Sequence, residues 1–207
     1  MLIEAFEYKQ WADRRTLDAI RSLDGTRFPS ALKFARQQLN HMVRVEELFR
    51  ARLLGLSDPH SSTNSEVLPE LPELAERGSD SNQWFARYAR QLEPGHRLQT
   101  ISFQFVDGLR GTMTRLEILF HIINHSSYHR GAISHALDMA EVPHPADTYT
   151  AFIHSAEPAR REQELARDRS VPEKSMIALV SPESRVRREW LAAPETPASR
   201  GSTSRRE

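Results

Sequence analysis

Residues 116–137 read "LEILFHIINHSSYHRGAISHAL", and this stretch decides the fold. Its apolar residues recur at helical spacing, and the preceding letters "TRLE", Thr114 to Glu117, resemble a capping box. We therefore expect a helix from about Thr114 to Ala140. Because residues four apart share one helical face, the pattern predicts a single inner row on this helix: Ile118, Ile122, His125, His129, Ile133 and Ala136.

Two histidines in that row raise a chemical question. The imidazoles of His125 and His129 project from the same side of the helix, close enough for both to reach one cation. The best third ligand is His41, which falls on the core-facing row of an earlier helix, whereas the remaining candidates fall in loops or near helix ends: His60, His96, His144 and His154. Three imidazoles around a zinc-type ion leave a fourth position open for water or substrate, and nickel or iron(II) accepts the same ligands.

Two alternatives stay open at the level of sequence. A histidine on an apolar face is often a core residue that is hydrogen-bonded within the fold. In addition, His121 lies four residues before His125, so a 121/125 pair competes with a 125/129 pair on spacing alone. The residues between His125 and His129 include no glutamate, so the sequence does not support peptide hydrolysis of the HExxH type.

Further helices are expected on either side of this region. A helix from Ser30, as N-cap, to Leu54 ends at Gly55, and the Pro- and Ser-rich residues 56–72 predict a long crossing loop. Alternating apolar residues before Asp107-Gly108 predict a small hairpin. The remaining helices are expected at about Ile3–Leu23, Glu73–Leu92 and, as a short closing element, Asp147–Ile153.

The sequence also indicates where several charged residues lie. Glu46, Glu47 and Asp138 are expected on solvated or partly buried helical faces. Arg130 is expected to pair with a carboxylate within the fold or across a dimer, and Gly131 to allow a neighbouring helix to come close. Residues 156–207 are charged and rich in Pro and Ser, so we expect a disordered tail, in which Trp190 and its neighbours could dock on a partner.

Composition excludes several classes of function. Lys+Arg and Asp+Glu balance to a formal net charge of zero, which argues against nucleic acid as a partner. No cysteine occurs, so disulfides, thiolate metal sites and cysteine nucleophiles are excluded. The sequence shows neither a signal peptide nor an apolar run of the roughly 20 residues that a membrane span needs. A soluble, cytoplasmic protein without membrane contact is expected.

Three stretches resemble the DinB/YfiT-like family of metalloenzymes. They are "YKQWADRRTLDAI" (8–20), "LNHMVRVEELFRARLLG" (39–55) and "LFHIINHSSYHRGAISHAL" (119–137), the last with the pattern NHxxxHRG. The resemblance covers residues 1 to about 155 and implies an all-α fold, a four-helix bundle with a long crossover. Carried over by position, the family's metal ligands fall on His41, His125 and His129. The sequence departs from the commonest signature at Tyr128 and Ala132.

The resemblance also implies an activity. We expect a bundle that binds a divalent metal, zinc before nickel or iron, over residues 1–155, often as a homodimer, with a tail over 156–207. The metal would activate water or a low-molecular-weight thiol against a small-molecule substrate, as in a hydrolase or a thiol S-transferase. The alternative is a non-catalytic metal-binding bundle of the stress response. A third hypothesis is an interaction protein that works through its tail.

Overall fold

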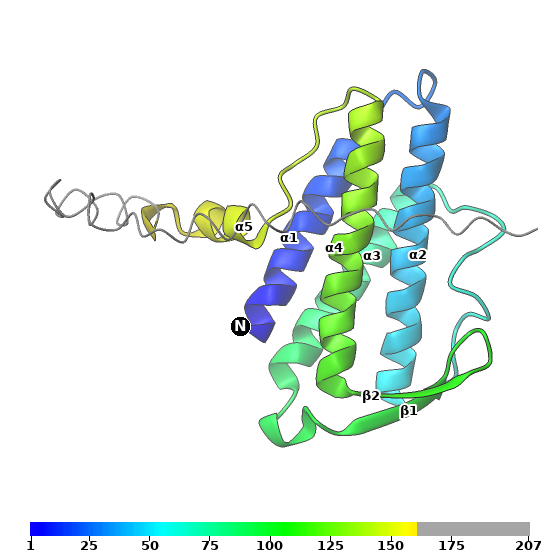
Figure 1. Ribbon diagram of the computed structural model, residues 1–207, viewed down its shortest axis with the longest axis vertical. Coiled ribbons are helices and arrows are strands. Elements are labelled where there is room, and N and C mark those ends of the chain that lie inside the picture. The colour runs from blue at the N-terminus through cyan, green and yellow to red at the C-terminus, as the bar shows by residue number, and fades with distance from the viewer. Residues whose placement is uncertain (161–207) are drawn as a thin grey trace, which may run out of the picture. The chain divides into compact units, whose positions relative to one another are not determined.

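Four long helices stand side by side in the computed structural model, which describes residues 1–160 (Figure 1). They are α1 (Leu2–Arg21), α2 (Pro29–Leu54), α3 (Leu71–Gln91) and α4 (Arg115–Met139). Each helix packs against two others: α1 and α2 both contact α3 and α4, and so lie on a diagonal of the bundle. The expected four-helix bundle is confirmed, while the expected tail from residue 161 onward, with Trp190, lies outside the described residues.

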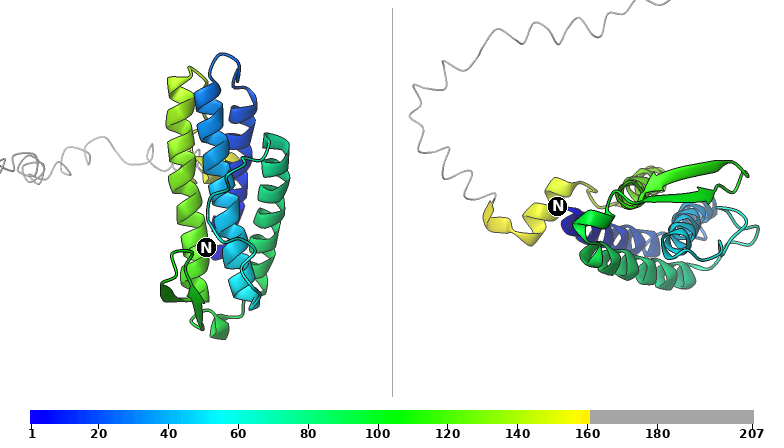
Figure 2. Two further views of the ribbon diagram at one scale, coloured as in Figure 1. Left: turned by 90° about the vertical axis from the view of Figure 1, so that its right-hand side faces the viewer. Right: turned by 90° about the horizontal axis from the view of Figure 1, so that it is seen from below.

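The connections determine the direction of each helix. A short turn joins α1 to α2, whereas residues 55–70 return along the bundle so that α2 and α3 run the same way (Figures 1 and 2). A short 3-10 turn (Pro94–His96) then leads into the hairpin β1 (Thr100–Gln104) and β2 (Arg110–Thr114), which crosses one end of the bundle. Gly108 has a φ of 86° in the turn, a backbone conformation that favours glycine.

The ends of the helices largely follow the local sequence. Thr114 Oγ1 accepts a hydrogen bond from the Glu117 N–H, and the Glu117 side chain accepts one from the Thr114 N–H, which confirms the capping box. Gly55 closes α2 in the left-handed conformation. The start of α2 differs from expectation: Pro29 is already helical, so Ser30 is not the N-cap, because proline suits the first turn of a helix.

A cluster of buried charges lies at the centre of the bundle. Its members, called here the core charge network, come from all four long helices and the segment after α4: Lys9, Asp13, Glu46, Asn82, Arg130 and Asp147. Lys9 Nζ lies 2.8 Å from Glu46 Oε1 and 2.8 Å from Asp13 Oδ2, and it donates to Asn82 Oδ1 at 2.6 Å. All three ammonium hydrogens therefore have an acceptor, as a buried lysine requires.

Glu46 joins all four helices. Besides Lys9 of α1, its carboxylate accepts hydrogen bonds from Ser81 of α3 and from Ser126 of α4. The side chain is only 2% exposed. The expectation that Glu46 lies on a solvated or partly buried face is therefore wrong, because its charge is matched in the core rather than by water.

Arg130 fulfils its expected role as an ion-pair partner. Its guanidinium is fully buried and lies 2.6 Å from Asp13 Oδ1 and 2.8 Å from Asp147 Oδ2. Tyr8 donates a further hydrogen bond to Asp147, which fastens the chain after α4 onto α1. The last described helix, α5 (Tyr149–Ala156), follows, and Phe152 packs edge-on against Trp11.

For Lys9 and Asp13, burial is the largest single influence on the pKa, but the charged partners together outweigh it. Burial lowers the pKa of Lys9, but Asp13 and Glu46 raise it, and the net shift is upward. For Asp13 the balance is reversed: burial raises the pKa of this carboxyl, and Lys9 and Arg130 lower it below its usual value. Both groups therefore stay charged in the core at neutral pH.

Gly131 does not serve the purpose expected of it. It is exposed, and within the described residues a Cβ built at this position would meet nothing within 4 Å.

The inner row of α4 also differs from expectation. Ser126 and Arg130 are buried, whereas His125 and His129 are only half-buried, because that face of α4 turns towards α2 rather than the bundle axis.

The core charge network yields a prediction of stability. We expect Lys9→Met to lower the free energy of unfolding by about 3–5 kcal/mol, because it leaves buried carboxylates without their counter-charge. Chemical denaturation would measure this change. Arg50→Met is the matched control: it breaks the solvent-exposed pair with Asp80 and should cost less than about 1 kcal/mol. Equal losses in the two variants would contradict the assignment.

Candidate metal centre

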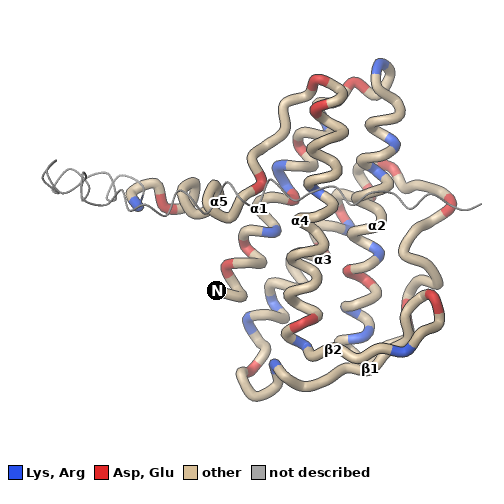
Figure 3. The backbone as a smooth tube through the Cα atoms, viewed as in Figure 1, with Lys and Arg blue, Asp and Glu red and all other residues tan. Residues whose placement is uncertain are grey.

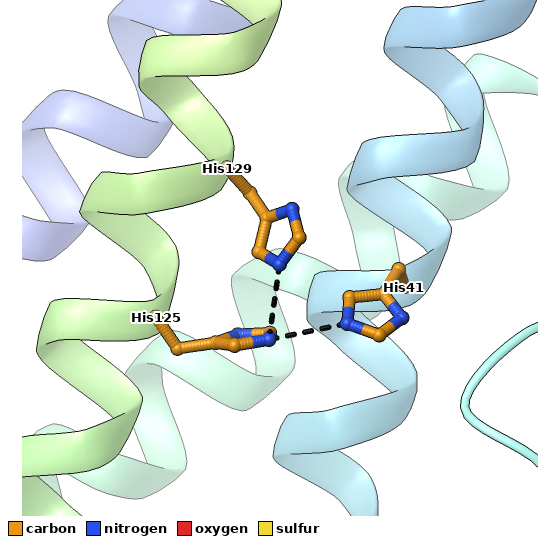
Figure 4. A group of neighbouring side chains, drawn as sticks. All are labelled: His41, His125 and His129. Atoms are coloured by element: carbon orange, nitrogen blue, oxygen red, sulfur yellow. Dashed lines mark hydrogen bonds between the residues drawn. The ribbon is translucent and has the colours of Figure 1, made fainter. Parts of the chain in front are cut away.

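Three imidazoles converge between α2 and α4 (Figure 4). His41 projects from α2, and His125 and His129 project from successive turns of α4. The Nε2 atom of His125 lies 3.2 Å from that of His41 and 3.1 Å from that of His129. One donor atom from each ring lies within 4.8 Å of the other two, so the group could hold a metal ion.

The spacing of the nitrogens suits a small divalent ion. Zinc binds imidazole nitrogen at about 2.0–2.1 Å, and tetrahedral geometry then separates two ligand nitrogens by about 3.3 Å. The two shorter separations in this group fall close to that value. No carboxylate belongs to the group within the described residues, so its donor set is three neutral nitrogens.

The partners of His129 determine which nitrogen it offers. Its Nδ1 lies 2.6 Å from Gln38 Oε1, an oxygen that can only accept a hydrogen bond. Nδ1 therefore carries the proton, and in the neutral ring Nε2 presents a lone pair towards His125. A ring oriented in this way by a neighbouring polar group is the usual arrangement for a metal-ligating histidine.

The other two rings differ in their surroundings. The Asn64 side chain and the Thr63 backbone, both in the loop of residues 55–70, lie beside the His41 ring and act on its pKa. In contrast, Nδ1 of His125 is buried and has no partner within the described part of the chain. Nε2 is thus the nitrogen through which His125 interacts with its neighbours.

All three rings are held in the uncharged form. Burial, together with the neighbouring imidazoles and Lys9, lowers the pKa of His125 to about 3. Burial, with the His41 ring beside it, lowers the pKa of His129 to about 4. Burial also lowers the pKa of His41, although the neighbouring loop residues raise it in part. Metals bind neutral imidazole, so the site favours the ligand form.

The geometry favours one of the two histidine pairs that spacing left open. His121 does not belong to the three-histidine group; its ring packs against Phe49 at 5.1 Å and against His125 at 5.2 Å. Two other histidines form pairs elsewhere: His60 with Glu47 on α2, and His144 with Asp138. The resemblance placed the ligands on the same three residues that the fold brings together.

The loop of residues 55–70 is held beside this group by α2. Arg44 donates two hydrogen bonds to the Ser62 carbonyl oxygen, and Arg36 donates to the carbonyl oxygens of Leu68 and Pro69. Sequence reasoning identified the loop but missed the contacts of Thr63 and Asn64 with His41, for which a polar loop sequence gives no signal. Gln38 was also missed, although it precedes His41 by three residues and so shares its helical face.

The shifted histidines predict an acid-sensitive fold in metal-free protein. Unfolded histidines bind protons near pH 6.5, whereas folded His125 and His129 bind them only near pH 3 and 4. Between these values the unfolded state binds more protons, so stability is retained above pH 6.5 and falls as pH decreases towards about 3. Denaturation with a chelator between pH 7 and 5 would measure the slope, and His125→Gln should make it shallower. An unchanged slope would contradict the burial of a neutral ring.

A comparison with protein-family models assigns residues 1–165 to the DinB family. Comparisons with curated proteins and with solved structures found no match. None of the described helices is both long and apolar enough to span a membrane. The family match covers most of the 207 residues and includes all three histidines of the group. The resemblance seen in the sequence is therefore confirmed, and the chain belongs to the DinB family.

Proposed function

We propose that His41, His125 and His129 bind one divalent metal ion, and that the protein is a metal-dependent enzyme acting on a small molecule. The observation that carries the proposal is the convergence of three uncharged Nε2 atoms, with no fourth protein ligand among the described residues. Such a site leaves part of the ion's coordination sphere free. Zinc suits this ligand set best, and nickel and iron(II) are the alternatives.

The chemistry follows from the open position. A bound divalent ion lowers the pKa of a coordinated water or thiol and so supplies a nucleophile near neutral pH. The reaction is then either a hydrolysis or an S-transfer from a low-molecular-weight thiol. Because the chain has no cysteine, the thiol has to come from a cosubstrate.

The surrounding residues position this site. Gln38 Oε1 accepts a hydrogen bond from the Nδ1–H of His129, which keeps the Nε2 lone pair of His129 directed into the group. Thr63 and Asn64 orient the ring of His41 and place the loop of residues 55–70 beside the site. His121 packs against His125, and Phe49 packs against His121, so these two rings limit the space on that side. The substrate therefore has to approach along the seam between α2 and α4.

A non-catalytic role is the second candidate, because a metal held by residues of α2 and α4 would also cross-link these helices and stabilise the bundle by linkage.

The expected homodimer and cytoplasmic location stay predictions. Exposed Phe120 and Tyr128 make the outer face of α4 the surface where we place a dimer contact. Nucleic acid is not proposed as a partner: positive and negative side chains are mixed along the helices (Figure 3).

Metal analysis tests the ligand set directly. We expect wild-type protein to bind one equivalent of zinc, and His41→Ala, His125→Ala and His129→Ala each to weaken binding at least about 100-fold. His121→Ala is the matched control and should retain the full equivalent. Gln38→Ala should weaken binding by about 10- to 100-fold, because it removes only the orienting hydrogen bond. Full retention of tightly bound zinc by His41→Ala would show that the ligand set is wrong.

An activity assay separates the two candidates. With zinc-loaded protein, a small bacterial thiol and a generic electrophile, we expect adduct formation that is faster than in the thiol-only control. Activated esters without thiol test the hydrolytic branch in the same way. Either activity should disappear in His41→Ala. If neither appears, and X-ray absorption shows an ion with four protein ligands and no water, the metal has a structural role.

A further inference from the structure

A cavity lies in the bundle, lined by residues of α1, α2 and α3 and by none of the three histidines. It has a volume of 260 Å³. The metal group lies between α2 and α4, so the two features occupy different seams. The walls of the cavity are largely apolar: Leu17, Leu39, Met42, Val43, Leu74 and Ala75.

Small residues on α3 create this space. Ala75, Gly78 and Ser79 line the cavity where most helix pairs would interlock larger side chains. A Cβ at Gly78 would meet only Val43 Cγ2, at 3.7 Å, so the wall there is open rather than tightly packed. An apolar cavity of about 150 Å³ in another protein holds benzene. In proportion to its volume, the cavity between α1, α2 and α3 has room for a molecule of about ten non-hydrogen atoms.

The inner end of the cavity is polar, but its oxygens already have hydrogen-bond donors within the bundle. Asp13, Glu46 and Asn82 reach it from the core charge network. Their oxygens already accept hydrogen bonds from Lys9, Arg130 and the serines around Glu46. A cationic ligand would have to compete with buried ammonium and guanidinium groups for these oxygens, which disfavours an amine at this end.

The outer end carries positive charge. Arg14 and Arg21 line the cavity from the exposed side of α1. Within the described residues Arg14 has no ion-pair partner, and Arg21 has only Asp18, in a pair that is more than half exposed and therefore weak. Two guanidinium groups above an apolar cavity complement a ligand with a carboxylate at one end.

We infer that this cavity is a binding site for a small amphipathic carboxylate, separate from the metal group. The apolar part of the ligand lies between α1, α2 and α3, and the carboxylate pairs with Arg14 and Arg21. The inference does not rest on the proposed enzymatic function. It would stand if the histidines bound no metal.

Three probes of one shape test the charge preference. Calorimetric titration with phenylpropionate, phenylpropanol and phenylpropylamine compares a negative, a neutral and a positive end group on the same apolar body. We expect phenylpropionate to bind about tenfold or more tightly than phenylpropanol, and phenylpropylamine to bind weakest. Equal binding of the three, or no binding of phenylpropionate at millimolar concentration, would overturn the inference.

Variants locate the binding. Gly78→Leu fills the cavity and should abolish phenylpropionate binding, whereas Gly78→Ala adds a single methyl group and should bind within about threefold of wild type. Circular dichroism checks that both fold. Arg14→Gln should remove most of the preference for phenylpropionate over phenylpropanol. The matched control is Arg87→Gln, at an exposed arginine of α3 that does not line the cavity, and it should leave the preference unchanged.

A carboxylate could also bind to a metal, so the two sites have to be distinguished. In His125→Ala, and in wild-type protein treated with a chelator, we expect phenylpropionate to bind as it does to zinc-loaded wild type. Loss of binding in these samples would place the probe at the histidines and overturn the inference. Retained binding together with loss of zinc separates the cavity from the metal site.

Discussion

The carboxylate of Glu46 is the interaction on which the bundle depends. It lies at the bundle axis and accepts hydrogen bonds from Lys9 of α1, Ser81 of α3 and Ser126 of α4. Apolar packing alone permits helices to slide with little change in buried area. A buried carboxylate does not, because any slip would leave a charged group without its partners. Glu46 thereby fixes the positions of the four helices along the bundle axis.

These fixed axial positions explain why the three histidines lie together. Ser126 follows His125 directly, and Glu46 lies five residues after His41. The Ser126 hydroxyl, shared between the Ile122 carbonyl at 2.9 Å and Glu46 at 3.2 Å, therefore helps to set the register between α2 and α4. In this antiparallel register His41 faces His125 and His129, and Phe49, two turns further along α2, faces His121. The core charge network is thus a structural condition for the candidate metal centre, although none of its members belongs to the three-histidine group.

Much of the fold could be predicted from local sequence. Helical spacing, the Thr114 capping box, Gly55 and the Asp107-Gly108 turn each depend on neighbouring residues, and each occurs in the structure. Local sequence could not decide between the 121/125 and 125/129 histidine pairs, because both have the same spacing. Only the register of α2 against α4 separates them, and a single sequence carries that information weakly. The burial of Lys9 and Glu46 also could not be predicted from local sequence. Each charge interrupts an apolar row, and its counter-charge lies on another helix.

The loop of residues 55–70 has a further consequence. Arg36 and Arg44 hold it through the carbonyl oxygens of Ser62, Leu68 and Pro69, atoms that every amino acid possesses. These backbone contacts hold the loop in addition to its own side chains, of which Asp58, His60 and Ser65 also contact α2. Residues in it that face the histidines, such as Asn64, can be exchanged during evolution without moving the backbone that carries them. One helical scaffold can in this way present different side chains to the three histidines while its helices stay unchanged.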